Sequence, residues 1–381
     1  MFSLLKDGVL RLTDYDGTVL SLDLEGRILV YSNKKITYRR TMQNRYLKID
    51  YINFRRHVTM LGSDDSKAVE ESAIEFINKS ERLVGDEETK SILRNIIGKG
   101  PGYLDRDADK FRQTYNGGVP IVPPDQYFPI YLQATVGCYW NKCSFCNLYR
   151  DKDYRVKNAE EFEKHINNVK EFFGRGISAR RSVFLGDANS LAIEQKLLIK
   201  DLELIKREFG LPIYSFVDSI TTQRVKTEND LSEMKGLGLE RIYLGLESGS
   251  QTVLKLLNKP MDLDESSRLI KNVKSARMSM GLIILAGAGG KKYYLDHVKG
   301  TSEFISKLDL DRNDIIYISP LYIYQELPYA SAAKELGELG RTEEEEQYLL
   351  IKSNIKEKYK EYHGSELESP VVLYDLVESV Y

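Results

Sequence analysis

Six short apolar runs, each followed by a long connection, constrain the fold of this 381-residue chain more than any other feature. The runs occupy residues 128–136, 182–185, 213–217, 241–246, 282–286 and 315–319. Connecting stretches such as 160–173, 191–209 and 263–278 have helical periodicity. Because parallel strands need long crossovers, the alternation predicts an α/β fold with a parallel sheet. Six units are fewer than the eight of a complete barrel, so we expect a partial parallel (β/α)6 TIM-like barrel.

The segments that flank this core differ from it in pattern. Residues 1–66 contain short β-branched and aromatic runs with Gly17 and Gly26 between them, which predicts a small β-rich N-terminal domain. Residues 67–126 begin with helical spacing and continue from 98 as an irregular Gly- and Pro-rich connecting segment. We expect part of this segment to cover the mouth of the barrel. The core spans 127–330, and residues 331–381 predict a charged, helical C-terminal extension.

Composition and charge exclude several classes of protein. The net charge of −2 and the 42% hydrophobic content indicate neither a nucleic-acid-binding chain nor a disordered one. The start lacks an apolar core of signal-peptide length, and the longest apolar stretch, 281–289, is too short for a bilayer. We therefore expect a cytoplasmic protein without a membrane span. Residues 1–60 carry eleven Lys and Arg against six Asp and Glu. This excess favours solvated strands, and contact with RNA is the second interpretation.

All three cysteines, Cys138, Cys143 and Cys146, fall within nine residues directly after the first apolar run. In parallel barrels the loops that follow strands form the reactive face. Three thiolates on one loop can bind three corners of an iron–sulfur cube and leave the fourth iron open. Two alternatives remain: buried structural cysteines, and a zinc site completed by His165 or His297.

The segment 137–146, GCYWNKCSFC, resembles the cluster loop of the radical S-adenosylmethionine (radical SAM) superfamily. That loop has the pattern C-x-x-x-C-x-x-C with an aromatic residue before the last Cys, here Phe145, and this chain has one extra residue between Cys138 and Cys143. The resemblance covers roughly residues 127–330. It implies a 4Fe–4S cluster on the three cysteines, which reductively cleaves S-adenosylmethionine to a 5′-deoxyadenosyl radical, and an external electron donor of ferredoxin or flavodoxin type.

The resemblance also implies cofactor contacts at the ends of successive strands. After the second strand a turn would bind the methionine amino group with Gly186, Asp187 and Ala188. Ribose would meet Asp218 or Ser219, and the fourth strand would present Glu247 and Ser248. Lys259 would pair with the methionine carboxylate, while Phe145, Ala286, Gly287 and Leu321 would complete the cofactor pocket around adenine. No residue of this pattern identifies the catalytic group that meets the substrate.

Two classes of function follow. One cluster uses all three cysteines, so none remains for an auxiliary cluster, which argues against sulfur insertion and against methylases with a spare Cys pair. The first class is therefore an enzyme that abstracts hydrogen from an unidentified organic substrate, such as a cofactor precursor, a lipid, a peptide or a tRNA base. The second is a non-catalytic zinc or iron–sulfur module with a structural, electron-transfer or sensing role. Anaerobic reconstitution distinguishes them.

Overall fold

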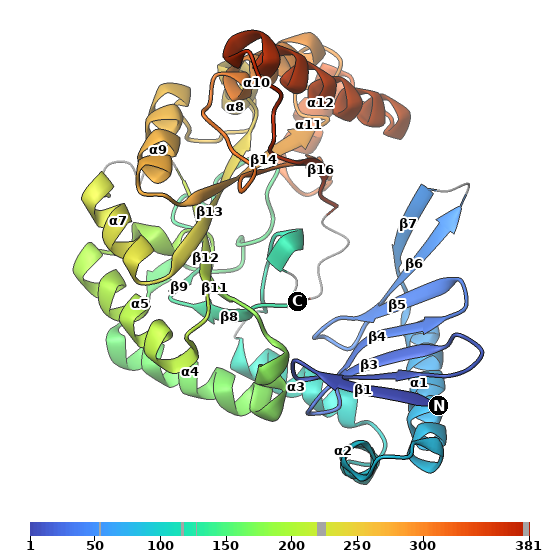
Figure 1. Ribbon diagram of the computed structural model, residues 1–381. Coiled ribbons are helices and arrows are strands. Elements are labelled where there is room, and N and C mark those ends of the chain that lie inside the picture. Colours follow the sequence, from blue (N-terminus) through green and yellow to red (C-terminus); the bar gives the residue numbers. More distant parts are fainter. Residues whose placement is uncertain (53–54, 116–117, 127, 219–225, 376–380) are drawn as a thin grey trace. The chain divides into compact units, whose positions relative to one another are not determined.

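The computed structural model describes residues 1–52, 55–115, 118–126, 128–218, 226–375 and 381 (Figure 1). The chain divides into two compact units. The first unit comprises Met1–Ile130, Lys164–Ser182 and Leu376–Tyr381, and the second comprises Tyr131–Glu163 and Val183–Asp375. The break after Ile130 lies close to residue 127, where the sequence predicts the start of the core.

The first unit begins with a seven-stranded antiparallel sheet whose spatial order is its chain order. The strands are β1 (Phe2–Lys6), β2 (Val9–Thr13), β3 (Val19–Asp23), β4 (Ile28–Asn33), β5 (Ile36–Arg40), β6 (Tyr46–Ile52) and β7 (Arg55–Met60). Leu10, Leu12, Leu20 and Leu22 alternate along β2 and β3 and are buried against helix α1 (Ser63–Leu83). The predicted β-rich N-terminal domain is thus confirmed.

Two more helices follow, and one of them corrects the sequence analysis. Helices α1 and α2 (Glu87–Gly98) lie where helical spacing predicts them. Residues 103–114, expected to be irregular, form helix α3 (Tyr103–Thr114), with Leu104, Ala108 and Phe111 buried along one face. The glycines and prolines flank this helix and do not interrupt it, and Gly102 has the left-handed φ of 69° that begins it.

Two arginines from the basic N-terminal segment are buried in ion pairs with α3. Arg27 Nε lies 2.8 Å from Asp107 Oδ1, and Arg40 Nη1 lies 3.3 Å from Asp107 Oδ2. Arg27 also donates to the carbonyl oxygens of Phe172 and Phe173 at the end of helix α4 (Ala159–Phe173). These two cations stabilise the first unit from within, so they are not available for contact with RNA.

The second unit contains a seven-stranded sheet in the order β8-β11-β12-β13-β14-β15-β16. Its strands are β8 (Ile130–Gln133), β11 (Val183–Gly186), β12 (Ile213–Val217), β13 (Leu239–Glu247), β14 (Ser279–Ala286), β15 (Ile315–Pro320) and β16 (Val371–Leu373). All pairs from β11 to β16 are parallel. The connecting helices include α5 (Gln195–Phe209), α7 (Glu228–Gly236), α8 (Gln251–Leu256), α9 (Leu263–Ser275) and α10 (Tyr294–Ser306). Each new strand joins the same side of the sheet, as the partial barrel predicts.

The C-terminal extension is helical only in part. Helices α11 (Pro328–Leu336) and α12 (Arg341–His363) match the expectation for residues 331–381, but β16 adds a seventh strand beside β15. The three residues of β16 are too short a run to show a period. The strand forms because the edge of β15 offers unpaired backbone groups, as in the hydrogen bond from Ile316 N to Pro370 O of 2.9 Å.

An aromatic layer fills the interior of the barrel. Tyr131 stacks on Phe184, and Phe184 and Phe216 pack edge to face at 5.0 Å and both contact Tyr243. Gly281 faces the Tyr243 ring, where a larger residue would not fit. These rings come from the four neighbouring strands β8, β11, β12 and β13. None of the helices in the described residues is long and apolar enough to cross a membrane.

Replacing Gly281 with Ala tests this layer. An added Cβ would lie 2.2 Å from Tyr243 Cδ1, and overpacking of a core costs about 1–3 kcal/mol. We expect urea titration to show that loss in the free energy of unfolding. Gly236→Ala is the matched control, because an added Cβ there has no neighbour within 4 Å. Equal stabilities for the two variants would contradict the packing described.

Candidate functional site

The three cysteines lie on a loop, residues 137–150 (the cysteine loop), that follows β8 and the short strand β9 (Thr135–Val136). The loop begins at Gly137, whose φ is +76°. A Cβ at this position would lie 3.1 Å from the carbonyl oxygen of Lys152, so both conformation and space require glycine. The loop therefore starts at a fixed point at the carboxyl end of the sheet.

Asp187 holds that starting point from the neighbouring strand. Its fully buried carboxylate accepts hydrogen bonds from Gly137 N at 3.0 Å, Tyr131 Oη at 2.9 Å and Gln133 Nε2 at 3.1 Å. The carbonyl oxygen of Gly186 is engaged as well, by Ala134 N at 2.8 Å. In the turn of Gly186, Asp187 and Ala188, the groups expected to contact a cofactor are thus partly committed to the loop itself.

The cysteine thiols are free and partly exposed. Asn141 N donates to Cys138 Sγ at 3.4 Å. Burial raises the pKa of Cys143 to about 12 and also raises that of Cys146, while the charge of Lys259 acts in the opposite sense on both. A bound metal group would replace the protons of these two thiols.

Arg150 fixes the shape of the cysteine loop, although the sequence analysis did not single it out. Its guanidinium donates to the carbonyl oxygens of Cys146 at 3.0 Å, Asn141 at 3.1 Å and Cys143 at 2.5 Å. The planar, multi-donor guanidinium can hold three acceptors at once, which a lysine cannot do with fixed geometry. The only signal in the sequence was the position of an arginine four residues after the last cysteine.

The other side of the cysteine loop docks on the end of α8. Ser144 donates from N to Leu257 O at 2.9 Å and from Oγ to Leu256 O at 3.0 Å. Trp140 Nε1 donates to Asn258 O at 2.9 Å, and Asn258 Nδ2 donates to Lys142 O at 2.7 Å. The last carbonyls of a helix lack partners within the helix, and the loop supplies them here.

An ion pair lies beside the loop. Lys259 Nζ is 2.9 Å from Glu247 Oε1, and both side chains are mostly buried. Burial alone would lower the pKa of Lys259, but the charges of Glu247 and Cys143 outweigh it and raise that pKa. Glu247 ends β13 with a left-handed φ of +59°, which a side chain rarely adopts without a compensating contact. The structure thus brings Glu247, Lys259 and Cys143 together.

The remaining predicted cofactor residues differ in their surroundings. Phe145 and Leu321 share one apolar cluster with Leu285, next to Ala286 at the end of β14. Ser248 Oγ is engaged by His297 Nδ1 at 2.8 Å, and Gly287 N donates to Gln347 Oε1 of α12 at 2.6 Å. Asp218 Oδ2 accepts from Asn189 Nδ2. Ser219 lies outside the described residues.

The zinc alternative has little support in the described residues. Among them, no three His, Cys, Asp or Glu side chains are grouped to hold a single metal ion. His297 is buried against Ser248, and burial lowers its pKa to about 4. His165 is buried with its ring against Tyr115. An iron–sulfur cube spreads its thiolates over separate corners and does not require them to converge on one atom, so the loop fits a cluster.

Comparison with known proteins agrees with this chemistry. A model described as the radical SAM superfamily matches residues 132–304. A protein of Methanocaldococcus jannaschii, provisionally named a methylthiotransferase, is 26% identical over 276 residues, which are 68% of this chain and 56% of that protein. An uncharacterized methyltransferase of Pyrococcus horikoshii is 25% identical over 211 residues, 52% of this chain and 42% of that protein. The chain spans about half the length of these curated relatives.

The solved structures that this chain resembles have lower sequence identity to it than the two relatives above. A crystal structure of methylornithine synthase aligns with 79% of this chain and 81% of its own, with a TM-score of 0.44 and 12% identity. Coproporphyrinogen III oxidase from Escherichia coli aligns with 64% of this chain and 55% of its own, with a TM-score of 0.43 and 15% identity.

The three hydrogen bonds of Arg150 predict a specific phenotype. Arg150→Gln should leave the fold intact, because the side chain is exposed, but should let the loop carbonyls separate. We expect iron to be lost to a chelator several times faster than from the unaltered protein, measured by absorbance under anaerobic conditions. Arg155→Gln, which removes only an exposed pair with Glu161, serves as the control. Equal rates of loss would show that Arg150 does not fix the loop.

Proposed function

Because the cysteine loop and the match over residues 132–304 place this chain in the radical SAM superfamily, we propose that it is an enzyme that abstracts hydrogen from an organic substrate. The observation that carries the proposal is the cysteine loop, held by Asp187 and Arg150 at the carboxyl ends of parallel strands. When bound, the 4Fe–4S cluster and S-adenosylmethionine supply the 5′-deoxyadenosyl radical that removes the hydrogen atom.

The cluster ligands are Cys138, Cys143 and Cys146, each contributing one thiolate. Asp187 and Arg150 are positioning residues, because they contact the loop backbone and hold the sulfurs in place. Phe145 and Leu321 pack in one group of apolar side chains. They would form an apolar wall beside the iron–sulfur cluster. We assign to S-adenosylmethionine the space next to Gly186, Ala188, Asp218, Ser248, Ala286 and Gly287, and the expected contact of Ser219 lies outside the described residues.

The ion pair of Glu247 and Lys259 suits the amino-acid end of S-adenosylmethionine. That end carries an ammonium and a carboxylate group, so it is complementary to a carboxylate and an ammonium that already lie side by side. Lys259 would bind the carboxylate of the cofactor, and Glu247 its amino group. One buried pair would become a network of opposite charges, which offsets the cost of keeping charge out of water.

The number of cysteines limits which reactions can follow hydrogen abstraction. The curated relatives are named for transfer of methylthio or methyl groups. Within these 381 residues, however, the three cysteines can hold one cluster and no auxiliary one. We therefore propose that this chain uses its single cluster for hydrogen abstraction followed by rearrangement, oxidation or coupling, with an external donor of ferredoxin or flavodoxin type supplying the electron.

Iron analysis tests the cluster. Anaerobically reconstituted protein should contain about four iron and four sulfide per chain, and Cys138→Ala, Cys143→Ala or Cys146→Ala should each abolish the cluster and cleavage of S-adenosylmethionine. All three cysteines are in the loop, so no cysteine elsewhere can serve as a control. Ser144→Ala takes that role, because it changes the same loop without removing a sulfur. Full iron and full cleavage in any one Cys variant would remove that residue from the ligand set.

Binding of the cofactor tests Lys259. Loss of a charge-assisted hydrogen bond should weaken S-adenosylmethionine binding by about 1.5–3 kcal/mol in Lys259→Ala, with unchanged iron content. Equilibrium dialysis on the cluster-loaded protein measures this. Lys255→Ala, an exposed lysine on α8, is the control. If Lys259→Ala bound the cofactor as tightly as the control, the carboxylate contact would belong to another residue.

A further inference from the structure

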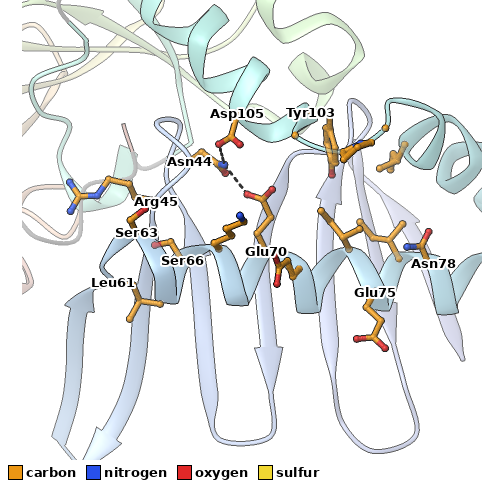
Figure 2. Close-up of a pocket in the computed structure, with 18 of the residues that line it drawn as sticks. Asn44, Arg45, Leu61, Ser63, Ser66, Glu70, Glu75, Asn78, Tyr103 and Asp105 are labelled. Atoms are coloured by element: carbon orange, nitrogen blue, oxygen red, sulfur yellow. Dashed lines mark hydrogen bonds between the residues drawn. The ribbon is translucent and has the colours of Figure 1, made fainter.

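A groove of about 1220 Å³ runs along helix α1 in the first unit (Figure 2). Residues of α1 and its cap, from Gly62 to Asn78, form one wall, and residues from Ile96 to Asp105 form the other. Since a helix rises 1.5 Å per residue, the first wall is about 24 Å long. The groove belongs to the first unit alone, whereas the cysteine loop belongs to the second.

Two carboxylates, Glu70 on the first wall and Asp105 on the second, meet at one side chain in this groove. Asn44 Nδ2 donates to Glu70 Oε2 at 2.8 Å and to Asp105 Oδ1 at 2.7 Å, as the dashed lines in Figure 2 show. Arg40 Nε donates to Asn44 Oδ1 at 2.6 Å and so fixes the amide. Asn44 is neutral, and within the described residues neither carboxylate forms an ion pair with Lys or Arg. Arg40 acts on Glu70 from nearby, but its guanidinium pairs with Asp107, so neither carboxylate has a cation of its own among the described residues.

A second feature of the same groove also lacks a partner. Ser66, one helical turn before Glu70, lines the groove and is only 6% exposed, and its Oγ has no hydrogen-bond partner in the described part of the chain. Buried hydroxyls are nearly always hydrogen-bonded, so this one leaves a hydrogen-bonding group open to a ligand in the groove. Burial also raises the pKa of Glu70, and Asp105 adds to that effect.

Size, apolar surface and charge define the missing ligand. Ile74, Ile77 and Ile96 also line the groove, so an aliphatic chain can pack there. Lining residues include four acidic side chains and two basic ones, which disfavours phosphate groups. The volume exceeds the 300–1,000 Å³ that is common for small-molecule sites, and about seven residues of extended chain would span the wall.

We propose that this groove binds an extended peptide segment through a lysine or arginine side chain whose cationic group lies between Glu70 and Asp105. The aliphatic part of that side chain packs on the isoleucines, and the peptide backbone can donate to Ser66 Oγ. The first unit would thereby select a peptide, as substrate or as partner, at a site of its own. This inference does not depend on the cluster chemistry proposed above.

The test uses the full-length protein and fluorescein-labelled peptides of about seven residues, a length set by the groove. One peptide mixture has lysine at its centre among Ala, Leu, Val and Ser, and matched mixtures have norleucine or glutamate there. Fluorescence anisotropy should show the lysine mixture binding at least about tenfold more tightly than the norleucine mixture, since a charge-assisted hydrogen bond of about 1.5 kcal/mol gives that ratio. Equal affinity of the two, or no binding of either, would overturn the proposal.

Variants locate the site. The double variant Glu70→Gln with Asp105→Asn keeps acceptors for Asn44 but removes both charges, so it should abolish the preference for lysine. The control Glu88→Gln, on the exposed start of α2, should keep that preference. If the double variant fails to fold, Glu75→Lys, an exposed residue of the same groove, should weaken binding without unfolding. A retained preference for lysine in the double variant, or unchanged affinity in Glu75→Lys, would overturn the proposal, as would unlabelled spermidine that competes better than the unlabelled lysine mixture.

Discussion

The Asp187 carboxylate is the interaction on which the site of the second unit depends. It is buried at the end of β11, and its three donors come from β8 and from the first residue of the cysteine loop. Without it, three buried donors would each lose an acceptor, and an unsatisfied buried donor costs about 1–3 kcal/mol. One side chain thus aligns two strands and the loop that carries the sulfurs.

The sulfurs are then held from two further directions. Arg150 gathers three loop carbonyls, and the end of α8 binds the loop through Ser144 and Trp140. The same chain segment that follows α8 supplies Lys259, so the anchor of the loop and the charge next to Cys143 move together. A site supported in this way on strands and a helix keeps its ligands preorganised, which cluster assembly and cofactor binding both require.

The sequence predicted the parts of this molecule that depend on period and spacing. Six apolar runs correspond to β8, β11, β12, β13, β14 and β15, and the cysteine spacing identified the loop. Helix α3 was missed because flanking Gly and Pro residues dominate its segment, and β16 was missed because three residues have no measurable period. Arg150 and the burial of Asp187 could not be foreseen, because both depend on contacts between residues brought together only by folding. Tyr103 and Asp107, in the segment from which we expected a cover for the barrel mouth, contact Gly26 and the two arginines of the first unit.

The central claim is that three cysteines hold a cluster with one open iron for S-adenosylmethionine. Mössbauer spectroscopy of the ⁵⁷Fe-reconstituted, anaerobic protein tests it most directly, because it observes each iron site without turnover or a substrate. The account predicts a 4Fe–4S spectrum in which roughly one iron of the four changes its parameters when S-adenosylmethionine is added. A spectrum that S-adenosylmethionine leaves unchanged, or a protein that takes up zinc and no iron, would contradict it.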